Sequence, residues 1–137
     1  MSLFEYLSPP YPRPAIQTVL VVDDQVLVRM VIADALRDGG YHVIEAGSAD
    51  EAMELLAQDA LSIDLVFSDI QMPGRIDGVD LARWLRSERP AVAVILTSGG
   101  PATAARHPSD EPPDWLMMDK PYSLSDVVSR VRGLLQA

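Results

Sequence analysis

Residues 18–24, TVLVVDD, place a short apolar run rich in β-branched residues directly before two aspartates. A continuous apolar run of this length is typical of a strand that is buried on both faces of a parallel sheet. The pattern recurs in LVFSD and AVAVILTS, and weaker versions occur in YHVIEA and WLMM. The sequence therefore predicts five strands, at residues 18–22, 41–46, 65–69, 91–98 and 115–118.

Helical patterns lie between most of these strands. Ser48 with Glu51, and Ser123 with Asp126, have the spacing of a capping box, in which each side chain binds the other residue's backbone N–H. A glycine pair after the first helical pattern is expected to end it. The expected helices run over residues 26–36, from Ser48 to Leu56, through Leu81, Trp84 and Leu85 to about Pro90, and from Ser123 to Leu135.

Two proline-rich segments depart from this alternation. Residues 1–17 contain four prolines, which disfavour a helix, so we expect an extended N-terminal tail there. Residues 99–114 contain two glycines and four prolines. They leave room only for a shortened or irregular fourth helix around residues 102–106, within a long loop.

The alternation of strands and helices predicts an α/β fold. Parallel strands need crossover connections, and the crossing helices cover both faces of the sheet. These connections are right-handed in nearly all proteins, which limits the topology to a few choices. The chain of 137 residues is long enough for one domain, which we place at residues 18–137.

The composition excludes several classes of protein. The chain has no cysteine, which removes disulfides, thiolate zinc sites and cysteine nucleophiles. The net charge of −9 disfavours direct binding to nucleic acid, which needs a basic surface. No apolar run reaches the roughly 18 residues of a membrane span, and the first residues lack the pattern of a secretory signal. We therefore expect a cytoplasmic protein without membrane insertion.

Polar residues follow the predicted strands where each apolar run stops. The carboxyl ends of parallel strands lie along one edge of the sheet, and ligands of open α/β sheets bind outside that edge. Residues that are far apart in the sequence are therefore expected to meet in one pocket. They are Asp23 and Asp24 after the first strand, Asp69 at the end of the third, Thr97 and Ser98 at the end of the fourth, and Lys120 after the fifth.

These residue types together suit phosphoryl transfer. Three neighbouring carboxylates repel one another, and a Mg²⁺ ion relieves the repulsion because it prefers carboxylate and phosphate oxygens. Lys120 would add a positive charge for a phosphoryl oxygen, and the Thr97 hydroxyl would add a donor. Carboxylates also serve as phosphoryl acceptors. The pattern therefore indicates a Mg²⁺-dependent transfer of a phosphoryl group to an aspartate.

Each of these residues also has an ordinary structural interpretation. Asp23 and Asp24 could cap the following helix, where the helix dipole favours negative charge. Lys120 could be a solvated surface charge. Thr97 could be an ordinary strand residue, and Ser98 could supply the hydroxyl in its place.

An enzyme of related architecture is a second functional hypothesis. Mg²⁺-dependent phosphohydrolases also place carboxylates at the edge of a sheet, and they usually need a second acid two residues after the nucleophile. The residue at that position after Asp69 is Gln71. The required acid is therefore missing. A third hypothesis, a binding module without phosphoryl transfer, conflicts with the intact acidic pair, the candidate acceptor Asp69 and Lys120.

The chain resembles the receiver domains of bacterial two-component response regulators. The resemblance covers residues 18–135 and depends on four motifs in order, VLVVDDQ, DIQMPG, ILTSG and MDKPY. It implies a flavodoxin-like, doubly wound five-stranded parallel sheet with the strand order 2-1-3-4-5. It also implies a signalling switch rather than an enzyme, with only Mg²⁺-dependent self-phosphorylation and slow self-dephosphorylation expected.

The resemblance assigns a role to each matched position. Asp69 would be the phosphorylated residue, and a sensor histidine kinase or histidine phosphotransfer protein would supply the phosphoryl group. Asp24 and Asp69 would bind Mg²⁺ directly, Asp23 would help through water, and the main-chain carbonyl of Gln71 would complete the protein ligands. The remaining implied features are a Lys120 pair with the phosphoryl group, a Thr97 that moves toward it, a cis bond between Lys120 and Pro121, and an output protein or effector domain that the sequence does not identify.

One position departs from the family pattern. Many receivers carry an aromatic residue three positions before the lysine, and its ring changes orientation as the threonine moves. Met117 occupies this position here. Trp115 and Tyr122 are the nearby aromatic residues that could take over this role.

Overall fold

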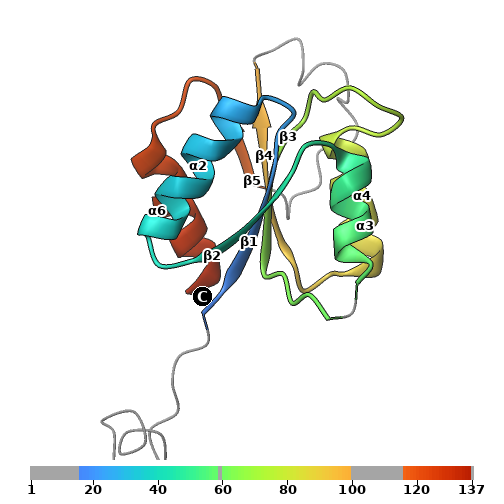
Figure 1. Ribbon diagram of the computed structural model, residues 1–137, viewed down its shortest axis with the longest axis horizontal. Helices are drawn as coiled ribbons and strands as arrows, with labels where there is room; N and C mark the ends of the chain where they lie inside the picture. The colour runs from blue at the N-terminus through green and yellow to red at the C-terminus, as the bar shows by residue number, and fades with distance from the viewer. Residues whose placement is uncertain (1–15, 59, 100–115, 137) are drawn as a thin grey trace, which may run out of the picture.

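The computed structural model describes residues 16–58, 60–99 and 116–136, which form a three-layered α/β structure (Figure 1). A central sheet separates two pairs of helices. The elements in chain order are β1 (Thr18–Val22), α2 (Val26–Asp38), β2 (His42–Ala46), α3 (Ala49–Leu56), β3 (Leu65–Asp69), α4 (Gly78–Glu88), β4 (Ala93–Ser98), β5 (Leu116–Asp119) and α6 (Leu124–Leu135).

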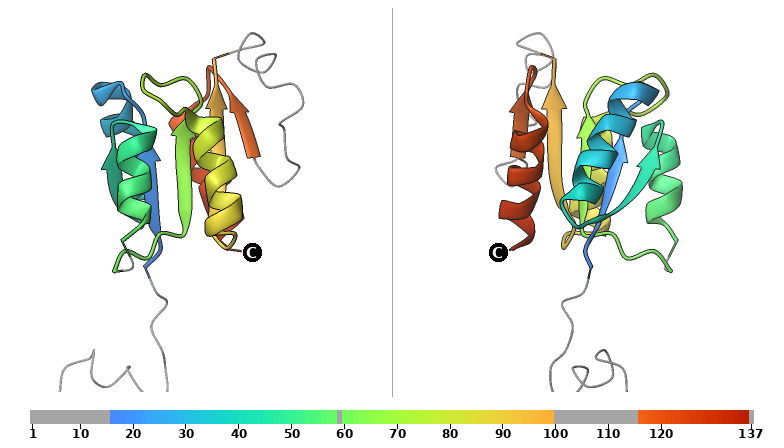
Figure 2. Two further views of the ribbon diagram at one scale, coloured as in Figure 1. Left: turned by 90° about the vertical axis from the view of Figure 1, so that its right-hand side faces the viewer. Right: turned by 60° about the vertical axis from the view of Figure 1, so that its left-hand side comes forward.

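The five strands are all parallel and lie in the order β2-β1-β3-β4-β5, as the resemblance implied. Both views in Figure 2 show the strands running in the same direction. The strand bounds differ slightly from the prediction. Residues 91 and 92 belong to a turn, because the Val92 N–H binds the Arg89 carbonyl at 3.0 Å. Tyr41 also lies outside β2, because its N–H binds Leu36 at the end of α2.

Helices α2 and α6 cover one face of the sheet (Figure 1). Their buried side chains pack on alternate residues of the central strands, which is the period of side chains along a strand. Since β1 and β3 are covered on both faces, nearly all their side chains are buried. This core cluster contains Val19, Val21, Ile32, Leu36, Leu65, Phe67, Ile95, Met118, Val127 and Val131.

Helices α3 and α4 cover the opposite face. Leu20, Val22 and Val66 point to this side, since they alternate with the residues of the first cluster. Trp84 of α4 is partly buried against the same core, and the Arg89 guanidinium lies 5.9 Å from its ring centre.

The capping predictions are confirmed for one helix and half confirmed for another. Ser123 and Asp126 form a complete capping box at α6. At α3, the Ser48 side chain accepts from the Glu51 N–H at 3.1 Å. The Glu51 carboxylate, however, accepts from Gly47 at 3.1 Å, one residue before the cap, so the reciprocal half of the predicted box is wrong.

Two expectations fall largely outside the described residues. The N-terminal tail was expected at residues 1–17, and only Ile16 and Gln17 of it are described. The shortened fourth helix was expected within residues 99–114, of which only residue 99 is described. Across the described ranges, no helix is both long enough and apolar enough to cross a membrane.

Candidate functional site

Three aspartates meet at the carboxyl ends of β1 and β3. One carboxylate oxygen from each of Asp23, Asp24 and Asp69 lies within 4.8 Å of the other two. Asp23 and Asp69 are buried, with 4% and 6% of their surface exposed, whereas Asp24 is exposed. The parallel sheet therefore brings together the residues that the sequence analysis placed at its edge.

Hydrogen bonds with other residues hold both the backbone and the side chain of Asp23. Its N–H binds the Ala46 carbonyl at 3.1 Å, and its carboxylate accepts from the Gln25 N–H at 2.9 Å. Burial raises the pKa of Asp23, and the charges of Asp69 and Asp24 act in the same direction, although the Gln25 bond and the charge of Lys120 oppose the rise. A buried carboxylate with raised pKa beside two others is a site that gains from a nearby cation.

The helix-cap interpretation of the acidic pair is wrong. The N-cap of α2 is Gln25, which makes no side-chain capping bond. The Asp23 carboxylate binds the N–H of this N-cap residue rather than an N–H of the first turn.

Lys120 reaches the cluster from the end of β5. Its ammonium donates to Oδ2 of Asp69 at 2.9 Å, and its backbone N–H binds the Ser98 carbonyl at 2.9 Å. Burial alone would lower the pKa of Lys120, but the hydrogen bond and charge of Asp69 outweigh it, so the pKa is raised. The peptide bond between Lys120 and Pro121 is cis, as expected. Lys120 is therefore a partner of the cluster and not a solvated surface charge.

Asp69 ends β3 where the chain turns toward α4. Its Oδ1 accepts from the Gln71 N–H at 3.3 Å. Gly78, the first residue of α4, lies so close that an added Cβ would overlap the Asp69 carbonyl oxygen and come within 2.8 Å of Ile70 Cα. The Gly78 N–H binds the Ile70 carbonyl at 2.9 Å. This close approach lets α4 support the backbone of Asp69 directly.

The alternation of side chains separates Thr97 from Ser98. Thr97 pairs in register with Asp69, so both lie on the α2–α6 face, whereas Ser98 lies on the opposite face. Both hydroxyl residues are 1% exposed. Thr97 is therefore the one whose hydroxyl shares a face with Asp69.

Tyr122 lies near Thr97 on the α2–α6 side of the sheet. The Tyr122 ring meets Phe67 edge to face with 6.1 Å between the ring centres. Burial raises the pKa of Tyr122, although the charge of Lys120 and the nearby Thr97 hydroxyl oppose the rise. An aromatic side chain near Thr97 is thus present two residues after the lysine, and Met117 packs on the α3–α4 side.

The acidic cluster suits a hard divalent cation. All three side chains offer carboxylate oxygens, which Mg²⁺ prefers. Two of these carboxylates are buried, and Lys120 pairs with one of them, Asp69. Asp23, Asp24 and Asp69 could hold such an ion.

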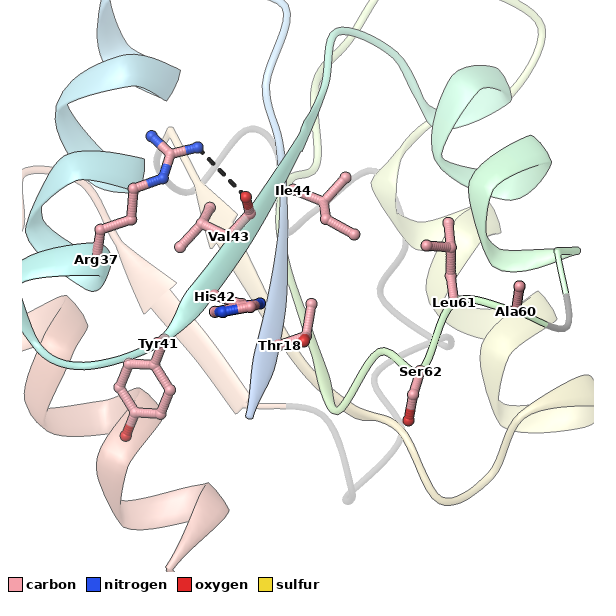
Figure 3. Close-up of a pocket in the computed structure, with 9 residues that line it drawn as sticks. All are labelled: Thr18, Arg37, Tyr41, His42, Val43, Ile44, Ala60, Leu61 and Ser62. Atoms are coloured by element: carbon pink, nitrogen blue, oxygen red, sulfur yellow. Dashed lines mark hydrogen bonds between the residues drawn. The ribbon is translucent and has the colours of Figure 1, made fainter. Parts of the chain in front are cut away.

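A hollow lies away from this cluster and shares none of its residues. It has a volume of about 500 Å³ and is lined by residues at the start of β1 and along the edge strand β2, among others (Figure 3). Thr18, His42 and Ser62 contribute its polar groups together with Arg37 and Tyr41. None of the predicted site residues lines it.

The sequence profile of the response regulator receiver domain matches residues 19–132. The chain belongs to the response regulator receiver domain family. Members of this family receive a phosphoryl group on an aspartate from kinases.

Individual relatives agree with this assignment. CpdR, a response regulator receiver protein from Brucella abortus, is 32% identical over 119 residues, which cover 87% of this chain and 97% of CpdR. The sensor kinase CckA from Brucella abortus is 38% identical over 121 residues, which cover 87% of this chain but 12% of CckA. PdtaR from Mycobacterium tuberculosis is 36% identical over 114 residues, and the chain spans 54% of its length.

Solved structures of receivers share the fold. A receiver protein from Sinorhizobium medicae WSM419 has a TM-score of 0.80 and 29% identity, covering 89% of this chain and 96% of that one. The receiver domain of the hybrid histidine kinase CckA has a TM-score of 0.70 and 32% identity, covering 87% and 99% of the two chains.

Two residues that support the site, Gly78 and Arg29, were not predicted from the sequence. Gly78 is the glycine of the DG pair after the acceptor loop, and only the close packing of α4 shows why a glycine stands there. Arg29 binds the main chain of Asp23 and has no distinguishing pattern in the sequence.

Proposed function

We propose that Asp69 accepts a phosphoryl group from a phosphohistidine of a sensor histidine kinase or phosphotransfer protein. In this step an Oδ atom of Asp69 forms a bond to phosphorus while the bond from phosphorus to the donor nitrogen breaks. Asp23, Asp24, Asp69 and the main-chain carbonyl of Gln71 would hold Mg²⁺, which neutralises charge on the transferring phosphoryl oxygens when bound.

The position of Lys120 is the observation that supports this proposal most. Its ammonium lies 2.9 Å from Oδ2 of Asp69 and so stands beside any group added to that carboxylate. A lysine is a compact charge that can follow a phosphoryl oxygen as it arrives. The Thr97 hydroxyl lies on the same face as Asp69 and supplies a second donor that could turn toward the same group.

The proposed modification acts as a switch. The phosphoryl group carries about −1.5 to −2 charge, which replaces the single charge of the Asp69 carboxylate beside buried Asp23 and exposed Asp24. Reversing a two-state population from 1:99 to 99:1 requires about 5.5 kcal/mol of preference for one state. One new charge-assisted bond contributes about 1.5 to 3 kcal/mol, so Lys120 and Thr97 would have to respond together.

The proposal describes a signalling domain and not a turnover enzyme. Self-phosphorylation from a small donor and slow self-dephosphorylation are the only reactions it includes. It places the protein in the cytoplasm, and the net charge of −9 supports the expectation of no direct contact with nucleic acid. In this proposal, the output protein or effector domain is the partner that binds the surface changed by phosphorylation.

Labelling followed by intact-mass measurement tests the proposal. Acetyl phosphate with Mg²⁺ should add the mass of one phosphoryl group to the wild-type chain, and EDTA should prevent the addition. Asp69→Asn should abolish labelling, whereas the matched variant Asp34→Asn, at an exposed position of α2, should label normally. Normal labelling of Asp69→Asn would contradict the assignment, and rapid turnover of a free phosphate ester would favour the phosphohydrolase alternative.

A further inference from the structure

We propose that Arg29 is a positioning residue for the metal site, because it fixes the main chain that carries Asp23 and Asp24. The chemistry of that site is the proposed function above. The inference itself concerns how tightly the acidic cluster binds a divalent cation, which is measurable without phosphoryl transfer.

The guanidinium of Arg29 joins the acidic pair to the edge strand. Its Nη1 donates to the Asp23 carbonyl at 2.9 Å, and its Nε donates to Oε1 of Glu45 in β2 at 3.2 Å. Its own N–H binds the Gln25 carbonyl at 2.9 Å, which seats it in the first turn of α2. The side chain is only 17% exposed, so these bonds meet little competition from water.

The residues after β2 leave room for this guanidinium. A Cβ on Gly47 would lie 3.3 Å from Nη1 of Arg29, closer than side chains usually approach. The Gly47 N–H is bound by Glu51, which holds the turn in place. The planar fork of arginine, with fixed donor directions, can meet a carbonyl and a carboxylate at once.

These bonds orient the acidic pair. The Asp23 N–H is bound by Ala46, and the Asp23 carbonyl is bound by Arg29, so the peptide groups on both sides of Asp23 are fixed. The second of these peptide groups leads into Asp24 and sets the direction from which its side chain starts. Repulsion among three carboxylates favours their separation when no cation is bound. Arg29 opposes that separation through the main chain.

Charge and position predict opposite effects on metal binding. The removal of a cation near a Mg²⁺ site weakens the repulsion of the metal ion, which would tighten binding. The loss of a bond that orients metal ligands should instead weaken binding, typically by about 10-fold to 100-fold. The sign of the change therefore separates a positioning role from a purely electrostatic one.

Arg37 provides a matched control. It also pairs with Glu45, at 3.3 Å, and with Asp34 at 3.3 Å, but it binds no atom of the acidic pair among the contacts described. Figure 3 shows its guanidinium donating to the Val43 carbonyl of β2, outside the metal site. Arg29→Met and Arg37→Met each remove one charge partner of Glu45, and only the first frees the Asp23 carbonyl.

The test is a titration with Mn²⁺ followed by electron paramagnetic resonance, with competition by Mg²⁺. Carboxylate and carbonyl oxygens suit both ions. We expect Arg29→Met to weaken binding of both ions about 10-fold or more, Arg37→Met to bind within about twofold of wild type, and Arg29→Lys to show an intermediate loss, since one ammonium cannot satisfy both partners. Melting curves in EDTA establish that each variant folds.

Each outcome decides the inference. Unchanged or tighter binding by Arg29→Met, or an equal loss in Arg37→Met, would overturn it. If Arg29→Met does not fold, Arg29→Lys decides, and wild-type affinity in that variant would overturn the inference. Failure of the wild-type chain to bind either ion or to label at Asp69 would instead overturn the proposed function.

Discussion

Lys120 and Asp69 form an ion pair of 2.9 Å although 51 positions separate them in the sequence. The pair exists because β5 and β3 end at the same edge of a parallel sheet. The Lys120 side chain is 35% exposed and the Asp69 side chain 7%, so the lysine covers a carboxylate that water hardly reaches.

The reactivity of Lys120 should report on this pair. Lys120 is the only lysine in the chain. Because Asp69 raises its pKa, less free amine is present at a given pH, and acylation by an amine-reactive reagent should be slow in EDTA. Asp69→Asn removes the partner while burial remains, so the pKa should fall and acylation should become faster. Peptide mass spectrometry measures both rates against the α-amino group, and equal rates in the two proteins would contradict the pair.

The raised pKa of Asp23 predicts a pH-dependent effect of Asp23→Asn without metal. A carboxyl group whose pKa is higher in the folded state binds its proton more tightly there, so its ionisation lowers the free energy of unfolding. This loss is complete above the raised folded pKa and absent below the ordinary value of 3.8. Asp23→Asn should therefore melt higher than wild type at neutral pH in EDTA, and the difference should vanish as the pH falls through that window.

The control for the Asp23 prediction is the metal itself. Added Mg²⁺ should raise the melting temperature of the wild-type chain more than that of Asp23→Asn, because binding to the folded state alone stabilises it. A lower melting temperature for Asp23→Asn in EDTA at neutral pH would contradict the prediction, because it would show that the ionised carboxylate does not destabilise the metal-free fold.

Gly78→Ala should destabilise the protein by disturbing the contact between α4 and the backbone of Asp69. The added methyl would overlap the Asp69 carbonyl, and overpacking of this kind typically costs about 1 to 3 kcal/mol of stability. Gly133→Ala in α6 is the matched control, since a Cβ there meets nothing within 4 Å and should add about 0.5 to 1 kcal/mol. Urea denaturation measures both changes. Equal stabilities of Gly78→Ala and Gly133→Ala would show that α4 does not pack closely against the backbone of Asp69.

Thr97 and Ser98 should differ in their effect on a bound phosphoryl mimic. Thr97→Val removes the hydroxyl on the face of Asp69, which should weaken Mg²⁺-dependent beryllofluoride binding by about 10-fold, the loss of one bond to a charged group. Ser98→Ala removes a hydroxyl on the other face and should leave the affinity within about twofold. Fluorine NMR titrations measure both affinities, and the reverse order would mean that Ser98 supplies the hydroxyl.

Sequence reasoning placed the strands well because burial on both faces leaves a strong local pattern. The bounds of β1 and β3 agree with the prediction at both ends. The start of β4 was predicted too early, since Val92 is apolar yet lies in a turn, and apolarity alone does not show which backbone groups pair. The Glu51 bond to Gly47 was missed for the same reason.

The site residues were predictable because each lies at the end of an apolar run. The residues that hold them in position were not predictable from the sequence. Arg29 and Gly78 act through contacts with the main chain of Asp23 and Asp69, and such contacts depend on how helices pack against strand ends. The choice between Thr97 and Ser98 also needed the register of β4 against β3. Neighbouring hydroxyls look alike in a sequence until the strand pairing is known.

A crystal structure with Mg²⁺ and beryllofluoride tests the central claim most directly. We predict beryllofluoride joined to the Asp69 carboxylate, Mg²⁺ held by Asp24 and Asp69 with the Gln71 carbonyl, and the Lys120 ammonium on a fluorine. The site left empty under these conditions, or beryllofluoride bound at another carboxylate, would contradict the account.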